Sequence, residues 1–198
     1  QTVKPSRKRL LRELARIEGV YVPSFYDVEY NSDGTIKHFL PGDETISAKV
    51  KKRTAENLDA AFYPTRQIVP YIQTVHDRIT LEIMRGCKHA CRFCQATNIY
   101  MSCRERSRAR VLELAEESYR ATGYDEISLL SLSSGDHSEI IDIVKGLNEI
   151  FKERAVSVSV PSLRVEESLE KLPALISQVK KSGLTFAPEV ASESLRNV

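Results

Sequence analysis

The stretch Arg85-Gly86-Cys87-Lys88-His89-Ala90-Cys91-Arg92-Phe93-Cys94 follows directly on an apolar, strand-like run at residues 79–84. Its three cysteines have the spacing C-x3-C-x2-C. A cubane iron–sulfur cluster has four irons and is usually held by four thiolates. Three closely spaced thiolates would hold three irons and leave the fourth open, and catalytic metal sites bind substrates or cofactors at open positions. The pattern therefore predicts an open iron–sulfur site at the end of a strand.

The same cysteines leave other kinds of site open. A structural zinc ion takes four ligands and usually draws them from paired C-x2-C motifs, so His89 or Cys103 would have to supply the fourth. A redox-active dithiol and buried, inert thiols are further alternatives. Cys103 lies beyond the cysteine run on a basic segment, where a free thiol is expected. Metal content separates the two main alternatives, because the iron–sulfur site needs iron with labile sulfide and the structural site needs zinc.

Composition places few limits on function. The chain has 198 residues, of which 41% are hydrophobic and 28% charged, enough for one sizeable core, and its net charge of +2 predicts no particular partner. The sequence contains no run of 18 apolar residues, so no membrane span is predicted. No signal-like apolar stretch follows the N-terminus, so secretion is not indicated. Clustered cysteines fit a reducing, cytoplasmic compartment. The chain begins at Gln1 and stops at Val198 without a closing signal, so we expect a piece of a longer protein.

The first part of the chain predicts an extension rather than a core. Residues 5–18 read as a short basic helix within a first segment, 1–18. Residues 21–30 alternate and are rich in aromatic side chains, and Asn31-Ser32-Asp33-Gly34 supplies turn chemistry, so a β-hairpin is expected. We assign residues 19–78 to this hairpin-containing extension.

The second part predicts alternating strands and helices. Strands are expected at 79–84, 126–132, 156–160 and 184–187, with helices at 107–122, 138–153 and 166–181. Ser107 and Gly123 are suited to cap the first helix, and Pro173 to open the third. Such alternation indicates βαβ units in a parallel sheet. The fold class is therefore α/β, with residues 79–198 forming about four units of a (β/α) barrel that the chain does not complete.

These motifs resemble the radical S-adenosylmethionine (radical SAM) superfamily. The cysteine loop matches its cluster-binding loop, and Ser133-Ser134-Gly135-Asp136, one βα unit later, stands where the superfamily often has Gly-Gly-Glu. At a finer level the chain resembles the cobalamin-binding-domain-containing, YgiQ-like radical SAM proteins. That resemblance rests on segments 19–26, 68–70, 85–96, 104–107, 129–136 and 184–189.

The resemblance implies a function and a site. It implies reductive cleavage of S-adenosylmethionine to a 5′-deoxyadenosyl radical by a 4Fe-4S cluster, with an electron donor such as flavodoxin or ferredoxin. The substrate and the catalytic residues that contact it cannot be named from the sequence. The resemblance also implies an upstream cobalamin-binding domain in the longer protein, with residues 1–18 as its tail or linker, so cobalamin would not be bound by this segment. The implied cluster ligands are Cys87, Cys91 and Cys94, and the implied cofactor contacts are Phe93 (adenine), Ser134, Gly135 and Asp136 (amino group), Ser159, Arg164 (carboxylate) and Glu189 (ribose).

A basic segment leaves a third kind of function open. Between residues 85 and 110 seven arginines and lysines stand against one acid, Glu105. Such a patch could bind RNA phosphates, balance the charge of a thiolate-bound cluster, or be a solvated loop. The rival functions are therefore a zinc-containing, non-catalytic RNA-binding module and a radical SAM enzyme that modifies RNA.

Overall fold

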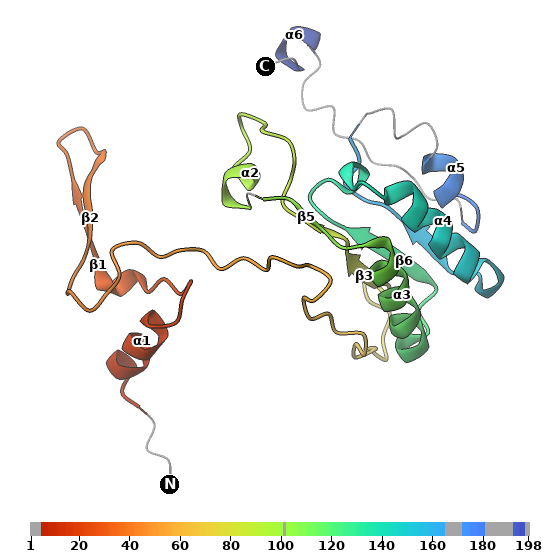
Figure 1. Ribbon diagram of the computed structural model, residues 1–198, viewed down its shortest axis with the longest axis horizontal. Coiled ribbons are helices and arrows are strands. Elements are labelled where there is room, and N and C mark those ends of the chain that lie inside the picture. Colours follow the sequence, from red (N-terminus) through yellow and green to blue (C-terminus); the bar gives the residue numbers. More distant parts are fainter. Residues whose placement is uncertain (1–4, 101, 165–171, 181–191, 197–198) are drawn as a thin grey trace. The chain divides into compact units, whose positions relative to one another are not determined.

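The computed structural model describes residues 5–100, 102–164, 172–180 and 192–196. The chain divides into two compact units, Gln1–Ala55 and Glu56–Val198, drawn in red to orange and in ochre to blue (Figure 1). The domain boundaries expected at residues 18 and 78 stay predictions.

The first unit contains the expected helix and hairpin. Its elements are α1 (Arg7–Ala15), a 3-10 turn η1 (Pro23–Phe25), β1 (Tyr26–Tyr30) and β2 (Ile36–Pro41). The strands pair antiparallel around a turn in which the Gly34 N–H donates to the Asn31 carbonyl at 3.0 Å. The first strand begins later than the aromatic pattern predicted, because Pro23 opens the 3-10 turn. Tyr26 and Phe39 stack across the hairpin with ring centroids 5.0 Å apart.

The second unit is built on a parallel sheet. The strands β3 (Ile79–Glu82), β6 (Glu126–Leu130) and β7 (Ser157–Ser159) lie in the order β3-β6-β7, and α3 (Arg108–Thr122) and α4 (Ile140–Phe151) connect them. This confirms the mixed α/β class and two complete βαβ units. The remaining elements are η2 (Ser134–Asp136), η3 (Lys152–Arg154), α5 (Leu172–Ile176) and α6 (Glu193–Arg196). The strand expected at 184–187 lies outside the described residues.

Local signals set the ends of α3. The Ser107 side chain accepts a hydrogen bond from the Arg110 N–H, and Gly123 ends the helix in the left-handed conformation, with φ of 71°. The serine hydroxyl satisfies a backbone N–H of the first helical turn, which has no partner within the helix. Glycine adopts positive φ without a steric penalty. Both predicted caps are confirmed.

The two faces of the sheet differ in chemistry. Helices α3 and α4 pack side by side on one face (Figure 1), and the side chains pointing toward them are apolar. These include Ile79, Leu81, Ile127, Leu129 and Val158, all at most 2% exposed. Because side chains alternate along a strand, the opposite face carries Thr80, Glu82, Ser128 and Ser159. The polar face therefore lies where a (β/α) barrel has its interior.

The strand expected at 79–84 is two strands. It leaves β6 after Glu82 and continues as β4 (Met84–Arg85), which pairs antiparallel with β5 (Arg104–Glu105). At Ile83 the pairing changes partners, because its N–H donates to the Leu130 carbonyl and its carbonyl accepts from the Arg106 N–H. A short helix, α2 (Ala96–Ile99), lies between β4 and β5. In the described part of the chain, no helix has the length and apolarity to cross a membrane.

Candidate metal and cofactor site

The cysteine loop is an excursion between two paired strands. It leaves β4 at Gly86 and returns to β5 at Arg104, where Arg85 is the partner of Arg104. Gly86 has φ of +91°, and a Cβ there would lie 2.7 Å from the Tyr100 carbonyl oxygen. The backbone at the start of the loop therefore passes so close to the backbone at its end that only glycine can occupy position 86. Within the loop, the Cys94 N–H donates to the Cys91 carbonyl at 2.9 Å, which brings the second and third cysteines into one turn.

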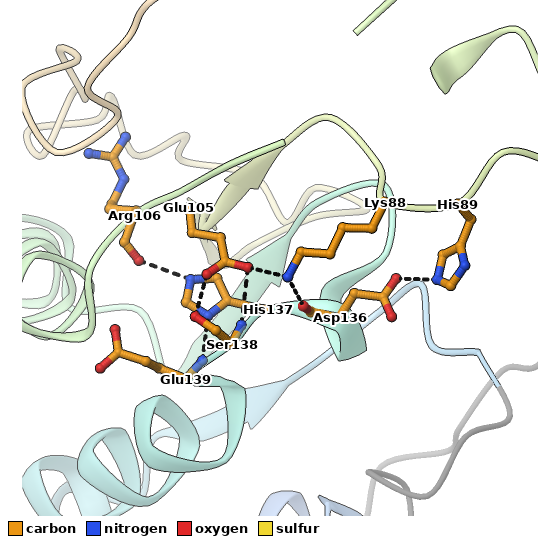
Figure 2. Close-up of polar contacts among 8 residues, drawn as sticks. All are labelled: Lys88, His89, Glu105, Arg106, Asp136, His137, Ser138 and Glu139. Atoms are coloured by element: carbon orange, nitrogen blue, oxygen red, sulfur yellow. Dashed lines mark hydrogen bonds and ion pairs between the residues drawn. The ribbon is translucent and has the colours of Figure 1, made fainter. Parts of the chain in front are cut away.

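Lys88 fastens this loop to the turn that follows β6 (Figure 2). Its Nζ donates to Glu105 Oε1 and to the Asp136 carbonyl oxygen, both at 2.8 Å. Glu105 also accepts from the Ser138 N–H at 3.1 Å and from the Ser138 hydroxyl. Burial opposes ionisation of Glu105, but the hydrogen bonds from Lys88 and Ser138 outweigh it and lower the pKa of this carboxyl to about 2. We call Lys88, Glu105 and Ser138 the latch.

His89 makes a second link between the same two segments. Its Nε2 lies 2.7 Å from Asp136 Oδ2 (Figure 2). The Asp136 side chain is only 9% exposed. Thr97, in α2, donates its hydroxyl hydrogen to the His89 carbonyl. Both residues that follow Cys87 thus contact Asp136, one at its carbonyl and one at its carboxylate.

The latch gives the fold a measurable acid sensitivity. A carboxyl whose pKa falls from its ordinary 4.5 to about 2 stabilises the folded state above pH 4.5 and loses that contribution as the pH falls toward 2. We expect Glu105→Gln to lower the free energy of unfolding by ~2 kcal/mol at pH 7, because a neutral amide binds Lys88 more weakly. The difference from wild type should shrink between pH 4.5 and 2, as urea unfolding across that range would measure.

Glu113 provides the control for the latch. It pairs with Arg110 at 2.5 Å on the exposed side of α3, with its side chain 56% exposed, and such surface pairs contribute about 0–1 kcal/mol. Glu113→Gln should therefore have little effect at any pH. An equal loss for both variants, or a Glu105→Gln deficit that persists unchanged at pH 2, would contradict the assignment.

The structure brings some predicted cofactor residues to the cysteine loop. Arg164 Nη1 lies 3.6 Å from Cys91 Sγ, and Asp136 meets the loop through Lys88 and His89. Ser159 ends β7 and donates to Glu126 Oε1 at 3.3 Å, on the polar face of the sheet. The proposed roles of these residues stay predictions.

Other predicted residues have a different setting. Ser134 is fully buried and its hydroxyl bonds to the Leu129 carbonyl at 3.2 Å, so it stabilises the η2 turn, in which Gly135 also lies. The Phe93 side chain is 73% exposed. Glu189 lies outside the described residues.

The basic segment is not the uniform patch that the sequence suggested. Arg106, counted there as a loop residue, is 1% exposed, and its Nε donates to the Glu82 carbonyl at 3.0 Å. It cannot meet a phosphate without disrupting the fold. Other members of the segment pair with acids, namely Arg85 with Glu82, Lys88 with Glu105, and Arg110 with Glu113. RNA binding by this segment stays a prediction, and fewer of its basic side chains are available for it than the sequence suggested.

His137 and Arg106 make structural contacts that the sequence did not reveal. His137 is buried, its Nδ1 accepts from the Glu139 N–H at 3.0 Å, and its Nε2 lies 2.9 Å from the Arg106 carbonyl oxygen. This pattern fits a neutral ring with its hydrogen on Nε2. The contact ties the start of α4 to the strand end that closes the cysteine loop, and only the sequence neighbourhood of Asp136 could have drawn attention to it.

The donor set fits an iron–sulfur cluster. Cys87, Cys91 and Cys94 are free, partly exposed thiols on one short loop, and Arg164 places a positive charge beside Cys91. Within the described residues, no three His, Cys, Asp or Glu side chains gather around one ion position. A cubane does not require that, because each thiolate binds a different iron. His89, a candidate fourth zinc ligand, is bonded to Asp136, and burial raises the pKa of the other candidate, Cys103.

The radical SAM superfamily family model matches residues 81–191, more than half of the chain and the whole of the described cysteine loop and η2 turn. The chain belongs to the radical SAM superfamily. An uncharacterized protein of Methanocaldococcus jannaschii is 31% identical over 168 residues, which is 85% of this chain and 35% of that protein. The chain thus spans about a third of the length of this relative. No solved structure matches the chain.

Membership in the superfamily implies a set of cofactors. Radical SAM domains use a 4Fe-4S cluster and S-adenosylmethionine, so the superfamily implies both cofactors and an enzyme. It also implies that β3, β6 and β7 are part of a (β/α) barrel, whose chemistry lies at the C-terminal ends of the strands. In this radical SAM chain the cysteine loop and the η2 turn both occupy that edge.

Proposed function

We propose that the protein holds a 4Fe-4S cluster through Cys87, Cys91 and Cys94 and binds S-adenosylmethionine at the remaining iron. When bound, the reduced cluster supplies one electron that cleaves the cofactor to methionine and a 5′-deoxyadenosyl radical, which abstracts a hydrogen from the substrate. The observation that carries the proposal is the attachment of the cysteine loop to Asp136 by two adjacent residues, Lys88 and His89. The cysteine loop and the Asp136 side chain are thereby neighbours, which supports the proposed roles of both.

The chain's own residues bind and orient the cofactor in this proposal. Asp136 presents a nearly buried carboxylate that suits the N–H donors of the cofactor's amino group. Arg164, beside Cys91, suits the carboxylate because a guanidinium can make a two-pronged contact. Phe93 is assigned to the adenine, Gly135 and Ser134 to the backbone turn beneath the amino group, and Ser159 and Glu189 to the nucleoside.

Finer assignments rest on the resemblance of the quoted segments. We propose that the chain is part of a YgiQ-like protein whose upstream domain binds cobalamin, and that a flavodoxin or ferredoxin supplies the electron. The 31% identity to a protein more than twice as long as this chain supports a longer parent protein.

Electron paramagnetic resonance tests the proposed function. The protein is reconstituted anaerobically with iron and sulfide, reduced with dithionite, and measured with and without S-adenosylmethionine. We expect a reduced-cluster signal that shifts when the cofactor is added, because the cofactor binds the open iron directly. Stoichiometric zinc without a cluster, or a cluster signal indifferent to the cofactor, would overturn the proposal.

A further inference from the structure

The contact between His89 and Asp136 is more specific than loop attachment requires. Lys88 already fastens the loop to the η2 turn through the Asp136 carbonyl and Glu105. His89 adds nothing to that backbone contact and instead reaches the carboxylate, with Nε2 at 2.7 Å from Oδ2. Its own main chain is held by the Thr97 hydroxyl. The His89 main chain is therefore held by α2, and its imidazole contacts one oxygen of the Asp136 carboxylate.

This geometry leaves the other oxygen for a ligand. Asp136 is nine-tenths buried, and a carboxylate so placed requires hydrogen-bond donors or a cation to offset its lost hydration. Oδ2 receives the imidazole, whereas Oδ1 accepts no hydrogen bond from the part of the chain that the structure describes. The amino group of the cofactor carries N–H donors, which the remaining carboxylate oxygen can accept.

We infer that His89 is a positioning residue, which orients the Asp136 carboxylate so that Oδ1 accepts the amino group of S-adenosylmethionine. The inference rests on the proposed function and deepens it by assigning a role to a loop residue that is not a cluster ligand. The same arrangement, in which one group orients a second that contacts the ligand, is general at metal sites. Because His89 lies between Cys87 and Cys91, it links the cluster loop directly to the amino-group site.

A ligand that lacks the amino group separates positioning from simple support of the loop. Dissociation constants are measured on the reconstituted protein, from the cofactor-induced change in the cluster signal, for S-adenosylmethionine and for its analogue without the α-amino group. We expect His89→Ala to weaken binding of S-adenosylmethionine by about tenfold and to leave binding of the analogue unchanged. His89→Gln should restore most of the loss, because its amide can place an N–H donor near the position of Nε2.

Controls make each outcome decisive. His38, an exposed histidine of β2, provides the matched variant, and His38→Ala should bind both ligands as the wild type does. Equal weakening of both ligands by His89→Ala, or no weakening of either, would overturn the inference. So would loss of the cluster signal in His89→Gln as well as His89→Ala, because His89 would then support the loop itself. Failure of the proposed function appears separately, as a wild-type protein with no cluster signal or none that responds to the cofactor.

Discussion

Replacing Cys91 by alanine will remove the cluster and, with it, cleavage of S-adenosylmethionine. Residues that only orient metal ligands change metal affinity or activity by roughly 10–100-fold when replaced, so loss of a ligand should reduce cleavage by at least about 100-fold. Cys87→Ala and Cys94→Ala should behave alike, since the three thiols share one loop. The measurements are the iron and sulfide content after reconstitution and the yield of 5′-deoxyadenosine.

Cys103 supplies the matched control for these variants. It lies at the end of the same loop and is also a free thiol, but burial raises its pKa and favours the protonated form, which is a poor iron ligand. Cys103→Ala should therefore keep its cluster and its activity. A cluster that survives Cys91→Ala but not Cys103→Ala would show that the ligand set has been assigned wrongly.

Gly86→Ala will destabilise the second unit more than any other single added methyl group at a described glycine of that unit. The residue has φ of +91°, and its Cβ would lie 2.7 Å from the Tyr100 carbonyl oxygen and 3.0 Å from the Cys103 Cα. These are backbone atoms, which cannot rotate away. We expect a loss of about 3 kcal/mol or more, combining ~1–2 kcal/mol for the left-handed conformation with the cost of moving one side of the loop.

Gly123→Ala measures the conformational part of that effect alone, so the difference between the two variants gives the steric part. Gly123 also has positive φ, 71°, but no atom lies within 4 Å of its added Cβ. It should lose only the conformational term, about 1 kcal/mol. Urea unfolding of both variants measures the difference. Equal losses would mean that the loop ends move apart freely and that Gly86 serves only its backbone angle.

Local signals explain which parts of the fold could be predicted. Ser107 and Gly123 bound α3 because a cap acts within a few residues, so the sequence alone contains it. The division of the strand at Ile83 could not be predicted in the same way. Residues 79–84 are a continuous apolar run, and the change of partner depends on Leu130 and Arg106, which are distant in sequence. Tertiary pairing overrides the local pattern there.

The candidate site shows the same division. The three cysteines were found from their spacing, which is a local pattern, and the family match covers them. The latch was missed because it joins residues that are distant in sequence, such as Glu105 and Ser138, which are 33 positions apart. The burial of Arg106 was missed because arginine is rarely fully buried, and nothing in the surrounding basic residues distinguishes the one that points inward.

The pairing of β4 with β5 has a consequence for chain entropy. This ladder joins the two ends of the cysteine loop. The chain entropy lost in bringing Gly86 and Cys103 together is therefore lost when the protein folds, and cluster binding does not have to offset it. Loop-closure entropy grows only slowly, by about 0.6 kcal/mol for each doubling of length. Lengthening the loop after Cys94 would therefore cost little chain entropy, and the contacts of Thr97 with His89 and of Tyr100 with Gly86 set the limit there. The spacing from Cys87 to Cys94 is instead set by the geometry of the cluster.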